Sequence, residues 1–217
     1  MVRARENFAT IVNLYCALAD KRVLEIGCGS GNYTKQLAPL CVEIVAIDPD
    51  AAAVQQAQDH VRSPNVAFKV MPVEELARLA GTFEVVIFTL SLHHVPDPLM
   101  NEAINEAVRA ADSSGFIVFL EPDHEGSFFE AELAFDACDG DEREAKAHAY
   151  RAMLSHPRLV GVAELPDQTE FRWDSLAGFV DTMRPRKNLS QLEPFLQEHH
   201  FTLSAKRRIN IFKISSR

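Results

Sequence analysis

The sequence predicts an α/β protein built around a parallel sheet that is buried on both faces. Four short apolar runs, at residues 22–26, 42–47, 65–70 and 83–90, alternate with helix-compatible segments, and a fifth run lies at 116–120. Strands that alternate with helices in this way form β-α-β units, whose strands run parallel with helices on both faces. A chain of 217 residues with 47% hydrophobic content can bury a sheet of this size in one domain.

The helices follow from the segments between and around these runs. Residues 4–18 carry apolar side chains at roughly helical spacing, which predicts an amphipathic N-terminal helix. The segments between the strands predict further helices at about 31–39, 50–61, 73–79 and 97–110.

The alternation ends after Glu121. Residues 127–154 are rich in Ala and Glu and predict a long helical region with an interruption near Gly140. A less regular span follows, so residues 122–170 are interpreted as a helical insertion, and insertions on such scaffolds commonly carry specificity.

The C-terminal part predicts helices at about 174–183 and 189–199. Two strands, FTLSAKRR and INIFKIS, are expected to close the chain as an antiparallel hairpin. The predicted single domain is therefore divided into an N-terminal helix (1–20), a core (21–121), the insertion or lid (122–170) and a C-terminal part with the last two strands (171–217).

The composition argues against several classes of protein. A formal charge of −9 opposes binding to nucleic acid and to anionic membranes. No apolar run approaches the ~20 residues that span a bilayer, and the N-terminus lacks the apolar core of a secretory signal. The four cysteines form no C-x-x-C pair, which indicates reduced thiols. A cytoplasmic protein without nucleic-acid or membrane partners is expected.

A glycine-rich turn, EIGCGSG, follows the first strand, where backbone N–H groups can approach a ligand closely. A phosphate loop would need Lys after its last glycine, but Asn32 follows Gly31. A dinucleotide turn would need glycine where Asn32 stands. Glu25, expected at the rim of the site two residues before Gly27, would repel a pyrophosphate and attract an ammonium or sulfonium group. The turn therefore predicts a cationic ligand.

This turn resembles the first motif of the class I S-adenosylmethionine-dependent methyltransferases. VEIVAIDPD is similar to the family's second-strand motif, FEVVIFTLSLHHVPDP to the fourth and GFIVFLEP to the fifth, so the resemblance covers about residues 20–122. It implies a Rossmann-like, doubly wound sheet of seven mostly parallel strands with an antiparallel last strand. It also implies S-adenosylmethionine as cofactor and S-adenosylhomocysteine as product.

The resemblance implies a set of cofactor-binding residues, in which Asp48 would bind both ribose hydroxyls. The set comprises Glu25, Gly27, Cys28, Gly29, Tyr33, Asp48, Pro49, Val73, Glu74, Thr89 and Leu90. Alternatives are a buried acid bonded to backbone amides for Glu25, a helix cap for Asp48 and simple packing for Tyr33. Asp50 could take the capping role instead. Pro72 stands where the family often has an acid that binds the adenine amino group, so that contact passes to Glu74, to backbone or to nothing.

Residues that would meet a methyl acceptor are less defined by the pattern, and the catalytic residues stay unknown. Histidine can accept a proton near neutral pH, which makes His93 and His94 candidates for a general base. The weak catalytic candidates are His94, His124 and Glu121, and the candidate substrate-binding residues are His94, Glu121, His124, Phe128 and Phe129. Core packing is the alternative for the two phenylalanines. A metal site of three histidines here lacks helical ligand spacing, and no metal is expected.

The predicted function is transfer of a methyl group from S-adenosylmethionine to a small molecule by direct in-line displacement. A non-catalytic cofactor-binding or regulatory module stays open, because such a module could keep every cofactor residue. An NAD-dependent oxidoreductase is disfavoured by the glycine spacing. The acceptor, the methylated atom and the oligomeric state are not specified by the sequence.

Overall fold

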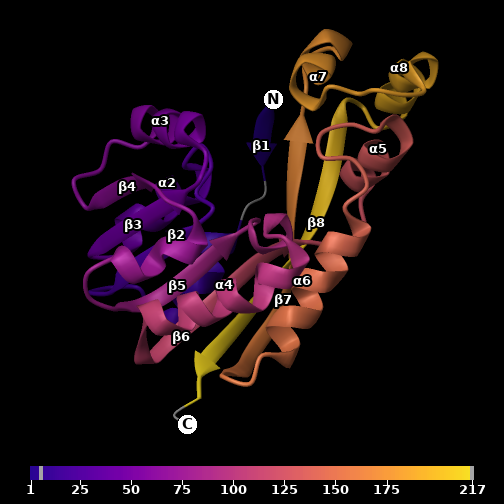
Figure 1. Ribbon diagram of the computed structural model, residues 1–217. Helices are drawn as coiled ribbons and strands as arrows, with labels where there is room; N and C mark the ends of the chain where they lie inside the picture. The colour runs from indigo at the N-terminus through magenta and orange to yellow at the C-terminus, as the bar shows by residue number, and fades with distance from the viewer. Residues whose placement is uncertain (5–6, 216–217) are drawn as a thin grey trace.

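The fold is organised by one mixed sheet with helices on both faces (Figure 1). The computed structural model describes residues 1–4 and 7–215, so residues 5–6 of the predicted N-terminal helix lie outside the described part. The strand order is β1-β7-β8-β6-β5-β2-β3-β4. The strands are β1 (Val2–Ala4), β2 (Arg22–Ile26), β3 (Glu43–Asp48), β4 (Val66–Val70), β5 (Phe83–Thr89), β6 (Ala111–Pro122), β7 (Leu159–Arg172) and β8 (Thr202–Ile214).

The strand directions confirm the predicted sheet. β2 is parallel to β3 and β5, and the parallel pairing continues to β4 on one side and β6 on the other. β8 is antiparallel to both of its neighbours, β6 and β7. The seven long strands are therefore mostly parallel with an antiparallel last strand, as the resemblance implied. The short β1, which was not predicted, adds an eighth strand antiparallel to the end of β7.

The helices cover the two faces of the sheet with separate cores. The helical elements are α1 (Phe8–Cys16), α2 (Asn32–Leu37), η1 (Ala38–Leu40), α3 (Ala51–His60), η2 (Val73–Arg78), η3 (Leu92–His94), α4 (Asp97–Ala110), α5 (Ser127–Phe135), α6 (Arg143–Ser155), α7 (Leu176–Met183) and α8 (Leu189–Glu198). One core contains buried side chains of η2, α4 and α6, and the other contains those of α1 and α2. None of the helices in the described ranges is long and apolar enough to cross a membrane.

The prediction was wrong about the last two strands. The segment expected to form a closing hairpin is one continuous strand, β8, and its antiparallel partner β7 lies largely within the span interpreted as insertion. The helical part of that span is α5 and α6, which confirms helices after the fifth core strand but ends them at Ser155. β7 escaped notice because Gly161 and Pro166 interrupt its pattern and many of its side chains are exposed. Among the described residues, β1 pairs with residues 170–172, so Pro166 lies outside that pairing and near the edge of the sheet, where proline is tolerated.

A third core packs around the projecting ends of β7 and β8. Figure 1 shows these two strands extending to α5, α7 and α8, away from the parallel strands. Trp173 is the largest fully buried side chain of this cluster, and its ring meets Phe179 with centroids 4.9 Å apart. Phe135 of α5 and Leu203 of β8 belong to the same cluster. The projecting ends of β7 and β8, together with α5, α7 and α8, thus form a core separate from the two cores on the faces of the sheet.

Candidate functional site

A cavity of about 610 Å³ lies at the carboxyl ends of the parallel strands. It opens where β2 lies between β3 and β5, the point of an open α/β sheet at which ligands bind. Every predicted cofactor-binding residue except Glu25 lines it, namely Gly27, Cys28, Gly29, Tyr33, Asp48, Pro49, Val73, Glu74, Thr89 and Leu90. Met71 and Pro72 lie in the same wall as Val73 and Glu74. The sequence therefore located this cavity correctly, while occupancy by a cofactor stays a prediction.

The glycine turn is fixed by hydrogen bonds and by close packing. The N–H groups of Gly27 and Cys28 both donate to the Ile47 carbonyl, at 2.9 and 3.0 Å. Gly27 has φ +78, and a Cβ there would lie 2.2 Å from the Ser91 Cβ, so only glycine fits. A Cβ on Gly29 would meet nothing within 4 Å. The turn is held against β3 while its middle faces open space.

Asp48 ends β3 and lines the cavity. One of its carboxylate oxygens accepts from the Gly29 N–H and the other from the Asp50 N–H, both at 2.9 Å. The cap of α3 is Asp50, whose side chain accepts from the Ala52 N–H at 2.8 Å. The capping alternative for Asp48 is therefore wrong. Its carboxylate instead joins the glycine turn to the wall of the cavity, and each oxygen keeps a lone pair for a ligand.

Glu25 is fully buried and does not line the cavity, so its expected place at the rim was wrong. Its carboxylate accepts from Thr34 Oγ1 at 2.5 Å and from Thr89 Oγ1 at 3.2 Å. Burial raises the pKa of Glu25 to about 7, although both threonine hydrogen bonds lower it. The alternative of a buried acid fits, with threonine side chains as partners in place of backbone amides. Position 25 points inward because β2 is a central strand, covered on both faces.

Tyr33 both lines the cavity and packs against a neighbouring helix, while its contact with a cofactor stays a prediction. It lines the cavity, and its ring packs edge-on against Phe8 of α1 with centroids 5.4 Å apart. Its hydroxyl accepts a hydrogen bond from Arg207 of β8. Arg207 is itself buried and lies beside Asp167 of β7 at 2.5 Å. This chain of contacts ties the start of α2 to the last two strands.

A second cavity, of about 230 Å³, adjoins the first. Leu90 and His94 line both, so these residues form the junction between the two cavities. Phe128 and Phe129 of α5 also line the second cavity. Both phenylalanines pack in the protein as well, since Phe128 lies 4.7 Å from the Phe171 ring, centroid to centroid. The packing alternative therefore holds, and the lid interpretation stays a prediction.

The other two candidate substrate residues are not brought to this cavity. Glu121 and His124 line a separate cavity next to α6. The Glu121 carboxylate turns toward the η3 turn, where it accepts from the Leu92 N–H at 2.9 Å and lies 2.5 Å from His93 Nδ1. His124 is exposed in the loop after β6, although its ring contacts Phe129. Glu121 thus contacts His93. Among the weak catalytic candidates, His94 alone lines the second cavity, and its contact with an acceptor stays a prediction.

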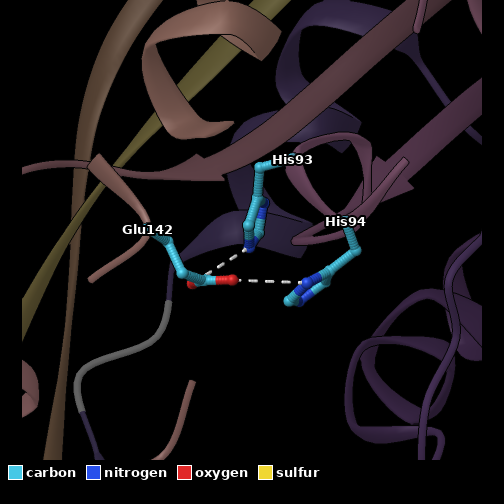
Figure 2. Close-up of side chains that lie close together, drawn as sticks. All are labelled: His93, His94 and Glu142. Atoms are coloured by element: carbon cyan, nitrogen blue, oxygen red, sulfur yellow. Dashed lines mark ion pairs between the residues drawn. The ribbon is translucent and has the colours of Figure 1, made fainter. Parts of the chain in front are cut away.

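The two adjacent histidines face one carboxylate, as Figure 2 shows. His93 Nε2 lies 3.8 Å from Glu142 Oε2, and His94 Nδ1 lies 3.4 Å from Glu142 Oε1. Burial alone would lower the pKa of His93, but Glu121 and Glu142 outweigh it and raise that pKa. Partial desolvation, helped by the charge of His93, lowers the pKa of His94, although its side chain is still 52% exposed. The pKa of His93 therefore lies above that of His94.

Sequence reasoning missed Glu142 and Lys146. Glu142 directly precedes α6, and the Lys146 ammonium lies 3.5 Å from a carboxylate oxygen of Glu142 and 3.5 Å from one of Glu132. Burial raises the pKa of Glu132 to about 7. The i, i+4 spacing of Glu142 and Lys146 looks like an ordinary surface pair, and only the fold shows that the lysine side chain is 4% exposed.

Comparison with known proteins finds a partial match in sequence. The family described as "Methyltransferase domain" matches residues 23–115. The ubiquinone biosynthesis O-methyltransferase of Albidiferax ferrireducens is 36% identical over 91 residues, which cover 40% of this chain and 36% of that relative. The chain thus matches about a third of that relative's length.

Solved structures share the fold at lower identity. A putative type II methyltransferase from Anaeromyxobacter dehalogenans has a TM-score of 0.69 at 20% identity, covering 98% of this chain and 97% of the other. The N-methyltransferase NodS from Bradyrhizobium japonicum WM9, in complex with S-adenosyl-L-homocysteine, has a TM-score of 0.57 at 15% identity, covering 94% and 84%. Residues 23–115 thus match a methyltransferase-domain family, and the fold of the whole chain is similar to that of solved methyltransferases.

Proposed function

We propose that this chain transfers the sulfonium methyl group of S-adenosylmethionine to a small molecule in the second cavity. The observation that carries this proposal is the junction of the two cavities at Leu90 and His94. Methyl transfer needs a cofactor and an acceptor in contact at one point, and this junction offers such a point. The cofactor would occupy the larger cavity, with its ribose on Asp48 and its adenine near Val73 and Glu74.

The reaction would be a direct displacement. A lone pair of the acceptor forms a bond to the methyl carbon, the carbon–sulfur bond breaks, and its electron pair stays on sulfur to give S-adenosylhomocysteine. The protein's contribution is to hold nucleophile, carbon and sulfur in line at about 3 to 3.5 Å and to exclude water. Phe128 and Phe129 supply the apolar part of that enclosure.

The acceptor is proposed only as a chemical class. Curated relatives carry the name of an O-methyltransferase, whereas one solved structure with this fold is named an N-methyltransferase. The cavity volume of about 230 Å³ suits a small molecule or one end of a larger one. A cytoplasmic location and the absence of nucleic-acid partners stay predictions.

The test has two stages. S-adenosylhomocysteine and S-adenosylmethionine are expected to raise the melting temperature by preferential binding to the folded protein, while NAD and ATP leave it unchanged. Transfer of a labelled methyl group to phenols, alcohols and amines then identifies the acceptor. Stabilisation by NAD at equal concentration would contradict the cofactor assignment. Tight cofactor binding with no transfer to any acceptor would favour a non-catalytic module.

A further inference from the structure

We propose that His93, His94 and Glu142 form a binding site for a divalent transition-metal ion such as Zn²⁺, at the junction of the two cavities. The three side chains each offer one ligand atom, and these atoms lie within 4.8 Å of one another. They come from two segments, because the histidines belong to the η3 turn and Glu142 precedes α6. Figure 2 shows both imidazole rings directed at the single carboxylate.

The distances suit a single ion. In a tetrahedral zinc site, nitrogen and oxygen ligands about 2.1 Å from the metal lie about 3.4 Å from each other. The separation of His94 Nδ1 from Glu142 Oε1 is 3.4 Å, and that of His93 Nε2 from Glu142 Oε2 is 3.8 Å. Only small movements would bring all three ligands to one centre. Two nitrogens and one oxygen form a ligand set that borderline ions such as Zn²⁺ accept.

The surroundings orient one ligand as metal sites usually do. The Nδ1 atom of His93 lies 2.5 Å from a Glu121 oxygen, and the other Glu121 oxygen accepts from the Leu92 N–H. This fixes the ring of His93 with Nε2 directed at Glu142. A carboxylate on the remote nitrogen of a metal-binding histidine sets its tautomer and raises its basicity. Glu121 is therefore a positioning residue for the site.

The local charge also favours a cation. Glu132 is buried and Glu142 is partly buried, and both lie 3.5 Å from one ammonium group, that of Lys146. Asp139 lines the same cavity, as do both carboxylates. Asp123 and Glu125 line it too, and Glu121 lies behind His93. These acidic groups outnumber the three cationic residues of the lining, Lys146, Lys206 and Arg207, so an additional positive charge can be accommodated. The histidines supply neutral donors where a further carboxylate would add repulsion.

The role of the ion rests on the proposed function, whereas its binding does not. His94 lines both cavities, so the ion would lie beside the point where acceptor and cofactor meet. A hydroxyl or phenol oxygen bound to the ion would have a lowered pKa and would release its proton to water. The resulting oxygen anion would then attack the methyl carbon. The class of acceptor this site favours is therefore an oxygen nucleophile.

Calorimetric titration of the chelator-treated full chain with Zn²⁺ and Co²⁺ tests the site directly. One ion per chain is expected. His94→Ala and Glu142→Gln should each weaken binding by at least about tenfold, and Glu121→Gln by about 10- to 100-fold. His199→Ala is the matched control, because it removes an imidazole whose ring contacts only Phe195 among the aromatic contacts of the described chain. Its affinity should equal that of wild type.

S-adenosylhomocysteine affinity, measured on the same samples, separates the two proposals. Glu142 does not line the cavity proposed for the cofactor. The Glu142→Gln variant should therefore keep its affinity for S-adenosylhomocysteine, which shows that it is folded, while its metal affinity falls. Metal binding without cofactor binding would support the metal site and contradict the proposed methyl transfer. Absence of saturable binding would overturn the site. So would binding that survives in both His94→Ala and Glu142→Gln but is lost in Cys138→Ser, because the ion would then lie on the neighbouring group of Glu132, Cys138 and Asp139.

Discussion

Replacement of Glu25 by Gln should change how stability depends on pH. Burial raises the folded-state pKa of Glu25 to about 7, from an ordinary value of 4.5. The folded protein therefore holds a proton that the unfolded chain releases between these values. By linkage, the free energy of unfolding falls as pH rises from about 4.5 to about 7, and the loss is absent below that window. The substitution removes the charge, keeps an acceptor oxygen for one threonine hydroxyl and places an amide NH2 beside the other threonine oxygen, to which it can donate.

The magnitude follows from the difference between the two pKa values. At about 1.4 kcal/mol for each unit, ionisation of Glu25 costs about 3 kcal/mol once the pH is well above 7. Most of that cost develops between about pH 5 and about pH 8. Gln has no such cost, so its stability relative to wild type should increase across this interval. Glu132, whose pKa is raised in the same way, affects both proteins equally and cancels in the difference.

Urea unfolding of wild type and Glu25→Gln across that pH range measures the effect. Glu130→Gln serves as the control, because Glu130 is an exposed acid on α5 and its substitution should leave the pH dependence unchanged. Parallel stability curves for wild type and Glu25→Gln would refute the reasoning, since Glu25 would then be ionised in the folded protein despite its burial.

Four further substitutions test the cavities and the packing of the glycine turn. Asp48→Ala removes the proposed ribose ligand, so S-adenosylhomocysteine affinity should fall by about two orders of magnitude in calorimetry; unchanged affinity in a folded variant would refute the assignment. Gly27→Ala should lower the melting temperature much more than Gly29→Ala, because only the first Cβ meets Ser91, and equal melting temperatures would contradict that packing. Phe129→Leu should keep cofactor affinity but lower turnover, since a poorly held acceptor loses alignment and can cost about a hundredfold in rate. Loss of cofactor affinity in that variant would place α5 in the cofactor site.

The parallel part of the sheet was predictable because its signals are local. Each of β2 to β6 contains a short apolar run. The closely spaced glycines Gly27, Gly29 and Gly31 indicate a tight turn, because all three have positive φ. Asp48 could be placed because the carboxyl ends of parallel strands meet at one edge. These features need no knowledge of distant parts of the chain.

The features that were missed depend on tertiary contacts. β7 carries Gly161 and Pro166, which are tolerated only because that strand lies near the edge of the sheet. Burial of Lys146 follows from the way α6 packs and has no signature in its neighbours along the chain. Glu25 was misplaced for the same reason, since spacing gives its distance from the turn but not the face of β2 to which it points.

The third core, built on the projecting ends of β7 and β8, has a consequence for how acceptor preference can diverge. Phe128 contacts this core through Phe171, whereas the glycine turn and Asp48 belong to the parallel half of the sheet. Substitutions that repack α5 against α7 and α8 can reshape the second cavity while the geometry around the cofactor stays intact. We therefore expect substitutions in this core to alter acceptor preference while the cavity proposed for the cofactor keeps its shape.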